Sequence, residues 1–165
     1  MKLVVTDTSV FIDLLDMGVL APFFALGFEV HTTAFVVDEL NAEQHVALLP
    51  FIGSRALVVD PFSGETVTVV EAMETRARLS FTDRSVIHLA LQLNATVLSG
   101  DGGIRKECKA RQMQLHGSIW VVEQLWQVGL VAPVSAIANL EWLRTHNHRL
   151  PVVEIDALID RIRKR

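Results

Sequence analysis

Two short stretches of the chain share a construction that could do chemistry, an apolar run that ends in an aspartate among small residues. The first is VVTDTSV, which carries Asp7, and the second is VLSGDGG, which carries Asp101. Each apolar run predicts a buried strand, and the turn after it opens a helix. In a parallel α/β sheet, ligands bind outside the carboxyl ends of the strands, where both aspartates would lie. Helix capping is the alternative for either aspartate alone, and the repetition argues against it.

Two more carboxylates are expected to point at the same edge of the sheet. Asp83 stands at the first turn of a predicted helix, in the capping-box pattern that begins at Ser80. Glu39 lies on another predicted helix, which Thr32 or Thr33 caps and which runs through about His45. A lone glutamate on a helix is usually solvated, but Glu39 shares its face with apolar residues, which favours an inward orientation.

Four converging carboxylates would repel one another unless a cation neutralised them. Carboxylate oxygens select hard cations, so we expect Mg²⁺ or Mn²⁺ at Asp7, Glu39, Asp83 and Asp101. Zinc is disfavoured because the six histidines are scattered and the chain has one cysteine. Such a site suits metal-assisted hydrolysis of phosphodiester bonds. No hydrolase triad motif, phosphate-binding loop or dinucleotide fingerprint competes with this interpretation.

The elements that position these residues alternate between apolar runs and helical patterns, which indicates an α/β fold with a parallel sheet. The predicted strands are 3–6, 29–32, 56–60 and 95–98. Besides those named above, the segments with helical patterns are 10–15, 64–78, 104–113, 114–134, 134–147 and 154–165, and 48–55 is expected to be a connection. Asp60 also ends a strand, but it runs into a proline-containing loop, so we expect a structural role for it.

Composition places the chain among globular proteins. With 165 residues we expect one domain, and a mean hydropathy of +0.36 suggests a full core and a protein interface, so a homodimer is expected. No run of about 18 residues escapes a charge, which disfavours a membrane span. An acid at residue 7 leaves no room for a signal peptide, and a single cysteine suits a reducing compartment. A cytoplasmic location is therefore expected.

The charge balance permits a polyanionic substrate without requiring one. The formal net charge is −4, but with four acids assigned to a cation site the remaining acids equal the 15 basic residues. Arg84 flanks Asp83, and Arg105 and Lys106 follow Asp101, so these three cations could hold phosphates. A basic run is more often a solvated helix face, and this alternative stays open.

At its acidic positions the chain resembles the PIN-domain ribonucleases. The resemblance rests on D-T-S after the first strand, an inward Glu on an early helix, an Asp at the start of a helix, and S-G-D after the following strand. It covers about residues 1–117 and assigns Asp7, Glu39, Asp83 and Asp101 to the acidic site, with Ser9 and Ser99 as accessory polar residues. It implies a three-layer α/β/α fold and endoribonuclease activity dependent on Mg²⁺ or Mn²⁺. It also implies a VapC-type toxin role with an antitoxin partner.

The chain departs from compact VapC-type toxins in a helical extension at about 118–165. This departure weakens the expectation of an antitoxin partner more than it weakens the assignment of the acidic site. Two alternatives to a ribonuclease remain: a non-catalytic protein that binds a protein partner through its apolar C-terminal helices, and phosphoryl transfer through an aspartyl nucleophile such as Asp7. The latter is disfavoured because no lysine lies in the strand-end turns to offset phosphate charge.

Overall fold

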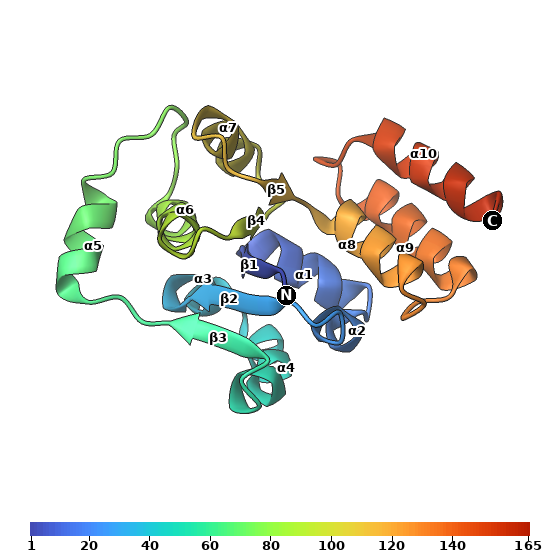
Figure 1. Cartoon of the computed structure of the whole chain (residues 1–165), viewed down its shortest axis with the longest axis horizontal. Coiled ribbons are helices and arrows are strands. Elements are labelled where there is room, and N and C mark those ends of the chain that lie inside the picture. The colour runs from blue at the N-terminus through green and yellow to red at the C-terminus, as the bar shows by residue number, and fades with distance from the viewer.

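A single sheet of five parallel strands forms the centre of the computed structural model, which describes all 165 residues (Figure 1). The strands are β1 (Leu3–Thr6), β2 (Glu29–Thr33), β3 (Leu57–Asp60), β4 (Thr96–Leu98) and β5 (Leu115–His116). Their order across the sheet is β3-β2-β1-β4-β5. The direction of winding reverses between β1 and β4, and in sheets of this kind the crevice at such a reversal is where ligands bind.

Helices cover both faces of the sheet, which makes the three-layer α/β/α arrangement that the sequence predicts. The helices are α1 (Thr8–Asp16), α2 (Leu20–Phe24), α3 (Ala34–Glu39), α4 (Ala42–Gly53), α5 (Gly64–Glu71), α6 (Phe81–Leu93), α7 (Gly102–Ala110), α8 (Ser118–Gln127), α9 (Pro133–His146) and α10 (Val152–Arg163). Helices α1, α2, α4 and α8 lie on one face, and α6 and α7 lie on the other. Helix α5 does not cover the sheet but lies outside α6 and packs on it (Figure 1).

The helix predicted to run through about His45 is wrong in its extent, because two helices occupy this region. Thr33 does cap α3, accepting a hydrogen bond from the Val36 amide, but α3 ends at Glu39. Asn41 then starts α4 through a reciprocal capping box with Gln44. Two local side-chain bonds to the backbone thus restart the helix.

The connection predicted at residues 48–55 is also wrong, since these residues belong mostly to α4. Pro50 lies inside the helix, where it removes one backbone donor. The helix continues past it to Gly53, and the Ser54 amide donates to the Pro50 carbonyl. A single proline near the end of a helix therefore did not break it.

Two other predicted helices begin or end differently. Helix α5 ends at Glu71, not Arg78, and contacts from other elements hold the segment beyond it. The Arg76 amide donates to the Glu107 carboxylate at 2.8 Å, and the Arg111 guanidinium donates to the Glu74 carbonyl at 2.8 Å. Within 114–134, the short strand β5 precedes α8, pairing with β4 before the helical pattern begins.

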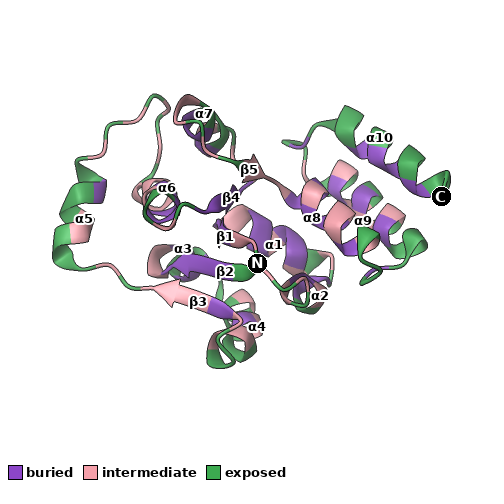
Figure 2. Cartoon of the chain, viewed as in Figure 1, coloured by how far each residue is buried: buried purple, intermediate pink, exposed green.

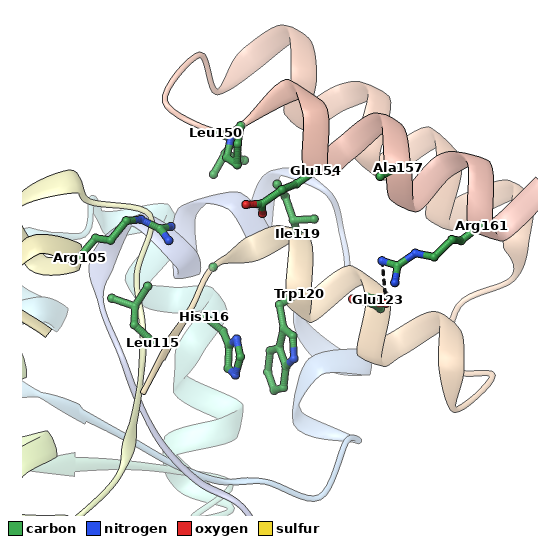
Figure 3. Close-up of a pocket in the computed structure, with 12 residues that line it drawn as sticks. Arg105, Leu115, His116, Ile119, Trp120, Glu123, Leu150, Glu154, Ala157 and Arg161 are labelled. Atoms are coloured by element: carbon green, nitrogen blue, oxygen red, sulfur yellow. Dashed lines mark ion pairs between the residues drawn. The ribbon is translucent and has the colours of Figure 1, made fainter. Parts of the chain in front are cut away.

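The C-terminal helices α8, α9 and α10 pack against one another beside the sheet. Helix α8 also packs on α1 and α2, which attaches the group to the core. A cleft of about 610 Å³ lies between α10 on one side and α7, β5 and α8 on the other (Figure 3). No helix of the chain has the length and apolar content needed to span a bilayer.

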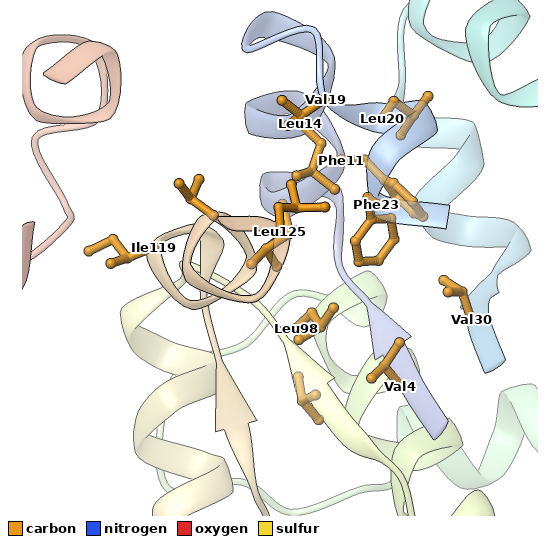
Figure 4. Packing of buried hydrophobic residues seen from close by; sticks show 14 of the residues in the cluster. Val4, Phe11, Leu14, Val19, Leu20, Phe23, Val30, Leu98, Ile119 and Leu125 are labelled. Carbon is orange, nitrogen blue, oxygen red and sulfur yellow. The ribbon is translucent and has the colours of Figure 1, made fainter. Parts of the chain in front are cut away.

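One hydrophobic core joins the sheet to all three C-terminal helices. Buried positions follow the strands β1 and β4 and the facing sides of α1, α6 and α8, as Figure 2 shows. Leu125 of α8 lies close to Leu14 of α1, and Leu98 of β4 lies beneath them (Figure 4). The same cluster extends to Leu140 and Ile155 in α9 and α10.

A buried carboxylate ties the C-terminal helices to α1. Asp13 is 6% exposed and accepts hydrogen bonds from the Ser118 hydroxyl at 2.6 Å and from the Asn147 amide at 3.1 Å. Ser118 begins α8 and Asn147 ends α9, so one side chain connects three helices. The pKa of Asp13 is raised, because the effect of burial exceeds the opposite effect of these two hydrogen bonds.

We expect Asp13→Ala to reduce the free energy of unfolding by about 2 kcal/mol, because it leaves the buried Ser118 hydroxyl and the partly buried Asn147 amide without their acceptor. Urea denaturation followed by circular dichroism measures this loss. Asp16→Ala, an exposed aspartate one turn along on the same helix, is the control and should change stability by less than about 0.5 kcal/mol. Equal effects of the two substitutions would contradict a docking role for Asp13.

Candidate metal centre at the carboxyl ends of β1 and β4

Asp7 is the most buried of the candidate acids, with 4% of its surface exposed. It directly follows β1, and its amide donates to the Leu98 carbonyl at the end of β4, which extends the pairing of the two strands. Its Oδ2 accepts from the hydroxyls of Ser99 at 2.8 Å and Ser9 at 3.0 Å. Burial raises the pKa of Asp7, these hydrogen bonds lower it in part, and the negative charge of Asp83 raises it further.

The hydroxyls of Ser9 and Ser99 each link the two strand-end turns. Each donates its proton to Asp7, and each also accepts a backbone amide: Gly100 N–H to Ser9 Oγ and Asp101 N–H to Ser99 Oγ, both at 3.0 Å. A hydroxyl has one proton to give and lone pairs to accept with, so these contacts fix its direction. The two serines therefore hold the Asp7 carboxylate and the Asp101 backbone in one rigid unit.

Asp101 is the N-cap of α7. Its Oδ1 accepts from the amides of Gly103 at 2.8 Å and Ile104 at 2.9 Å, so the capping alternative describes this oxygen correctly. The cap depends on Gly103, because a Cβ there would lie 2.8 Å from the Leu79 side chain and 3.0 Å from Asp101 Oδ1. Oδ2 of Asp101 has no hydrogen-bond partner within the chain, which leaves it available to a ligand.

Asp83 forms the predicted capping box with Ser80. The Asp83 amide donates to the Ser80 hydroxyl and the Ser80 amide donates to Asp83 Oδ2, both at 3.1 Å. Burial raises the pKa of Asp83, its bonds to Ser80 lower it, and the negative charges of Asp101 and Glu39 raise it further. Asp83 therefore lies within electrostatic reach of all three other acids, since its own charge also acts on Asp7.

Glu39 is the last residue of α3 and is exposed, so the burial expected from its apolar helix face is wrong. Its Oε2 accepts a hydrogen bond from the Thr8 hydroxyl at 2.9 Å. Thr8 is the first residue of α1 and the neighbour of Asp7, so this bond brings Glu39 to the carboxyl end of β1. Thr8 was not among the sequence-predicted site residues, although its place in the Asp7-Thr8-Ser9 turn was a signal for it.

The four acids gather at one edge of the sheet, but their side chains do not form a closed cage for a metal ion. No three aspartate, glutamate, histidine or cysteine side chains stand close enough together to hold one by themselves. Uncompensated carboxylates repel and each takes local hydrogen-bond donors, as Glu39 and Asp83 do here. The all-oxygen donor set fits Mg²⁺ or Mn²⁺ held by one or two carboxylates, because Mg²⁺ retains several waters and binds substrate phosphates.

The three cations proposed for phosphate contacts occupy different surroundings. The Arg84 guanidinium donates to the Glu71 carbonyl at 2.8 Å and so holds α5 against α6. Arg105 is exposed and lines the cleft under α10. Lys106 is exposed beside Arg76 and Lys109, away from that cleft. Of the three, Arg105 faces the largest hollow near the acids.

The comparisons with known proteins agree with this fold. The family model DUF3368, a PIN domain, matches residues 3–164, a span that includes the three C-terminal helices. No curated protein matches the sequence. Among solved structures, a PilT N-terminus domain protein from the archaeon Sulfolobus solfataricus P2 is similar with a TM-score of 0.50 and 15% identity, over 76% of this chain and 94% of that one. A domain of a functionally unknown protein from Methanocaldococcus jannaschii gives 0.48 and 18%, over 71% and 91%.

The buried charge of Asp7 yields a prediction about stability. Because the folded-state pKa of Asp7 lies above its ordinary value of 3.8, ionisation at neutral pH destabilises the metal-free fold. We expect Asp7→Asn to unfold at a higher temperature than the native chain at pH 7 in EDTA, by about 2–4 °C for each kcal/mol of relieved desolvation.

The difference should shrink as the pH is lowered through the raised pKa, since the native carboxyl then becomes neutral, and vanish below pH 3.8. Differential scanning fluorimetry across this range measures it. Asp38→Asn, on an exposed aspartate of α3, is the control and should leave the melting temperature unchanged at every pH. A destabilised Asp7→Asn at pH 7 would contradict the conclusion that burial of this charged carboxylate destabilises the fold.

Proposed function

This chain belongs to the PIN-domain family, and on that premise we propose that it is an endoribonuclease that hydrolyses RNA phosphodiester bonds with Mg²⁺ or Mn²⁺. The observation that carries the proposal is the buried Asp7 carboxylate at the crevice between β1 and β4. It has serine donors on one oxygen, no basic side chain paired with it, and three further acids around it. Such an arrangement suits a divalent cation better than it suits stability alone.

Asp7 and Asp101 are the residues we assign to direct metal contact, with Glu39 and Asp83 completing the surroundings. When bound, the cation would activate water and neutralise charge on the phosphate oxygens that react. Ser9 and Ser99 keep one oxygen of Asp7 fixed, and the cap of α7 does the same for Asp101. Fixed carboxylates lose little entropy on binding, so the loop geometry favours metal affinity.

The other two acids lie where they can orient water or accept its proton. Glu39 is exposed and reaches the site through Thr8, so it contacts solvent directly. The pKa of Asp83 is raised mainly by burial and further by Asp101 and Glu39, which moves this carboxyl toward the range useful to a general acid or base.

We expect Asp7→Asn to lower Mn²⁺-dependent cleavage of single-stranded RNA by on the order of a hundredfold or more, because it removes a charge that holds the cation. Cleavage of a fluorescently labelled RNA, followed on denaturing gels, measures the rate. Glu39→Gln should also reduce the rate. Its matched control is Asp38→Asn, which neutralises the exposed neighbour on the same helix.

Calorimetric titration with Mn²⁺ provides a second readout that does not depend on turnover. The native chain should bind Mn²⁺, and Asp7→Asn should bind it at least tenfold more weakly. Circular dichroism confirms that the variant is folded. Undiminished cleavage by Asp7→Asn would refute the assignment of this residue.

Two finer proposals concern partners. We propose a VapC-type toxin role with an antitoxin protein, which a small DNA-binding protein encoded next to this gene would support.

A non-catalytic protein that binds a partner through its C-terminal helices is the second candidate function. It is favoured by exposed apolar residues at the turn between α8 and α9 and at the start of α9: Val128 at 63%, Leu130 at 40% and Val134 at 80%. Absence of Mn²⁺ affinity in the native chain would favour this candidate over the nuclease.

The same apolar turn supports a homodimer. We expect light scattering to give the mass of two chains, and we expect Val134→Glu to shift the chain toward monomer, because a charge there would be costly to bury. Thr68→Glu, on the exposed part of α5, is the control. A monomeric native chain at every concentration tested would remove the dimer.

A further inference from the structure

The cleft under α10 has a volume of about 610 Å³. Its walls come from the α/β core and from the C-terminal helices (Figure 3). The core contributes Arg105 of α7 and His116 of β5, and the C-terminal helices contribute Trp120 of α8 and Glu154 of α10. The volume lies within the range typical of small-ligand sites. Neither the four acids nor their accessory serines line it, so the proposed cleavage site does not account for it.

The cleft adjoins the turn that carries the acidic site. The Arg105 amide donates to the Asp101 carbonyl, so Arg105 lies one helical turn beyond that acid. Leu150, which lines the cleft, comes within 4.0 Å of where a Cβ on Gly100 would be. Gly117, also in its wall, leads from the carboxyl end of β5 into α8. A polymer bound at the acids could therefore extend over the end of β5 into the cleft.

The floor of the cleft is a stack of aromatic rings. His116 and Trp120 lie parallel, with ring centroids 4.2 Å apart and 7° between their planes. Trp120 also stacks with Phe28 at 5.7 Å and lies under the Lys2 ammonium at 4.4 Å, whereas His116 has no other ring neighbour. Burial, and then the charge of Lys2, lower the pKa of His116, which favours the neutral imidazole. The stack thus ends on a flat ring that another flat ring could cover.

The charges around the stack are of two kinds. Arg161 and Glu123 form an ion pair at 2.9 Å and neutralise each other at the far end (Figure 3). Arg105 and Glu154 form no ion pair and project into the cleft from opposite walls (Figure 3). A free guanidinium is a phosphate ligand, and a free carboxylate accepts hydrogen bonds from the amino groups of bases.

We propose that this cleft binds one nucleotide of a single-stranded RNA next to the bond that is cleaved. Its base stacks on His116, its phosphate contacts Arg105, and Glu154 accepts from an amino group on the base edge. The inference rests on the proposed ribonuclease function and gives the C-terminal helices a part in substrate binding. Aromatic stacking beside a cation is the general means by which proteins bind single-stranded nucleic acids.

The test measures binding of a fluorescein-labelled single-stranded RNA octanucleotide to the full chain, with Asp7→Asn as background so that the RNA is not hydrolysed during the measurement. Fluorescence anisotropy gives the dissociation constant. We expect His116→Ala to weaken binding about tenfold, as loss of a base stack does, and His116→Phe to retain it. Arg105→Gln should weaken binding several-fold, and Lys109→Gln, an equal change of charge on the exposed side of α7, should weaken it less.

The outcomes separate this inference from the proposed function. If Asp7→Asn abolishes cleavage but His116→Ala and Arg105→Gln bind RNA like the control, the proposal that the cleft binds RNA is wrong, and the proposed nuclease function is supported. If the native chain cleaves no RNA but its binding depends on His116 and Arg105, the cleft stands as an RNA site without catalysis. Absence of RNA binding by the native chain overturns the cleft, and so does loss of binding in His116→Phe equal to that in His116→Ala.

Discussion

The structure depends on one unfavourable arrangement, an ionisable carboxylate placed almost out of water between two strand ends. Asp7 gains hydrogen bonds from Ser9 and Ser99, but burial still dominates and raises its pKa. Its neighbours add negative charge instead of removing it. A fold that only needed a stable turn here would be served as well by a neutral side chain. The sheet, both turns and the start of two helices are organised to keep this charge in place.

The C-terminal helices are part of that organisation and not an independent appendage. Leu125 packs against α1, the helix that starts beside Asp7, and Asp13 on the same helix binds both Ser118 and Asn147 (Figure 4). In the link between α9 and α10, Leu150 approaches Gly100, in the turn that carries Asp101. The position of α10 therefore sets the width of the cleft that begins at this turn.

The elements that carry the candidate acids were largely predictable from the sequence, because their caps and turns are local. Strands β1 and β4, the Ser80–Asp83 capping box and the turn at Asp101 depend on residues within a few positions of one another. The errors have physical reasons of two kinds. The restart of the helix at Asn41 came from a capping box with glutamine, a weaker signal than the apolar pattern that ran across it.

The other errors came from distant contacts. The end of α5 is set by groups such as Glu107, and β5 has two residues whose pairing with β4 cannot be seen in their own sequence. The bond between Thr8 and Glu39 joins residues 31 positions apart, so only the folded chain reveals it. The cleft likewise combines Arg105, His116 and Glu154 from three elements.

The central claim is that the buried carboxylate of Asp7, at the end of β1, holds a divalent cation. The most direct measurement is a crystal structure of the native chain soaked in Mn²⁺, with data collected for anomalous scattering. The account predicts an anomalous peak bonded to Asp7, with Asp101 as a further ligand and water completing the coordination. A saturated soak with no peak at this crevice, or with Mn²⁺ bound only elsewhere on the molecule, would contradict it.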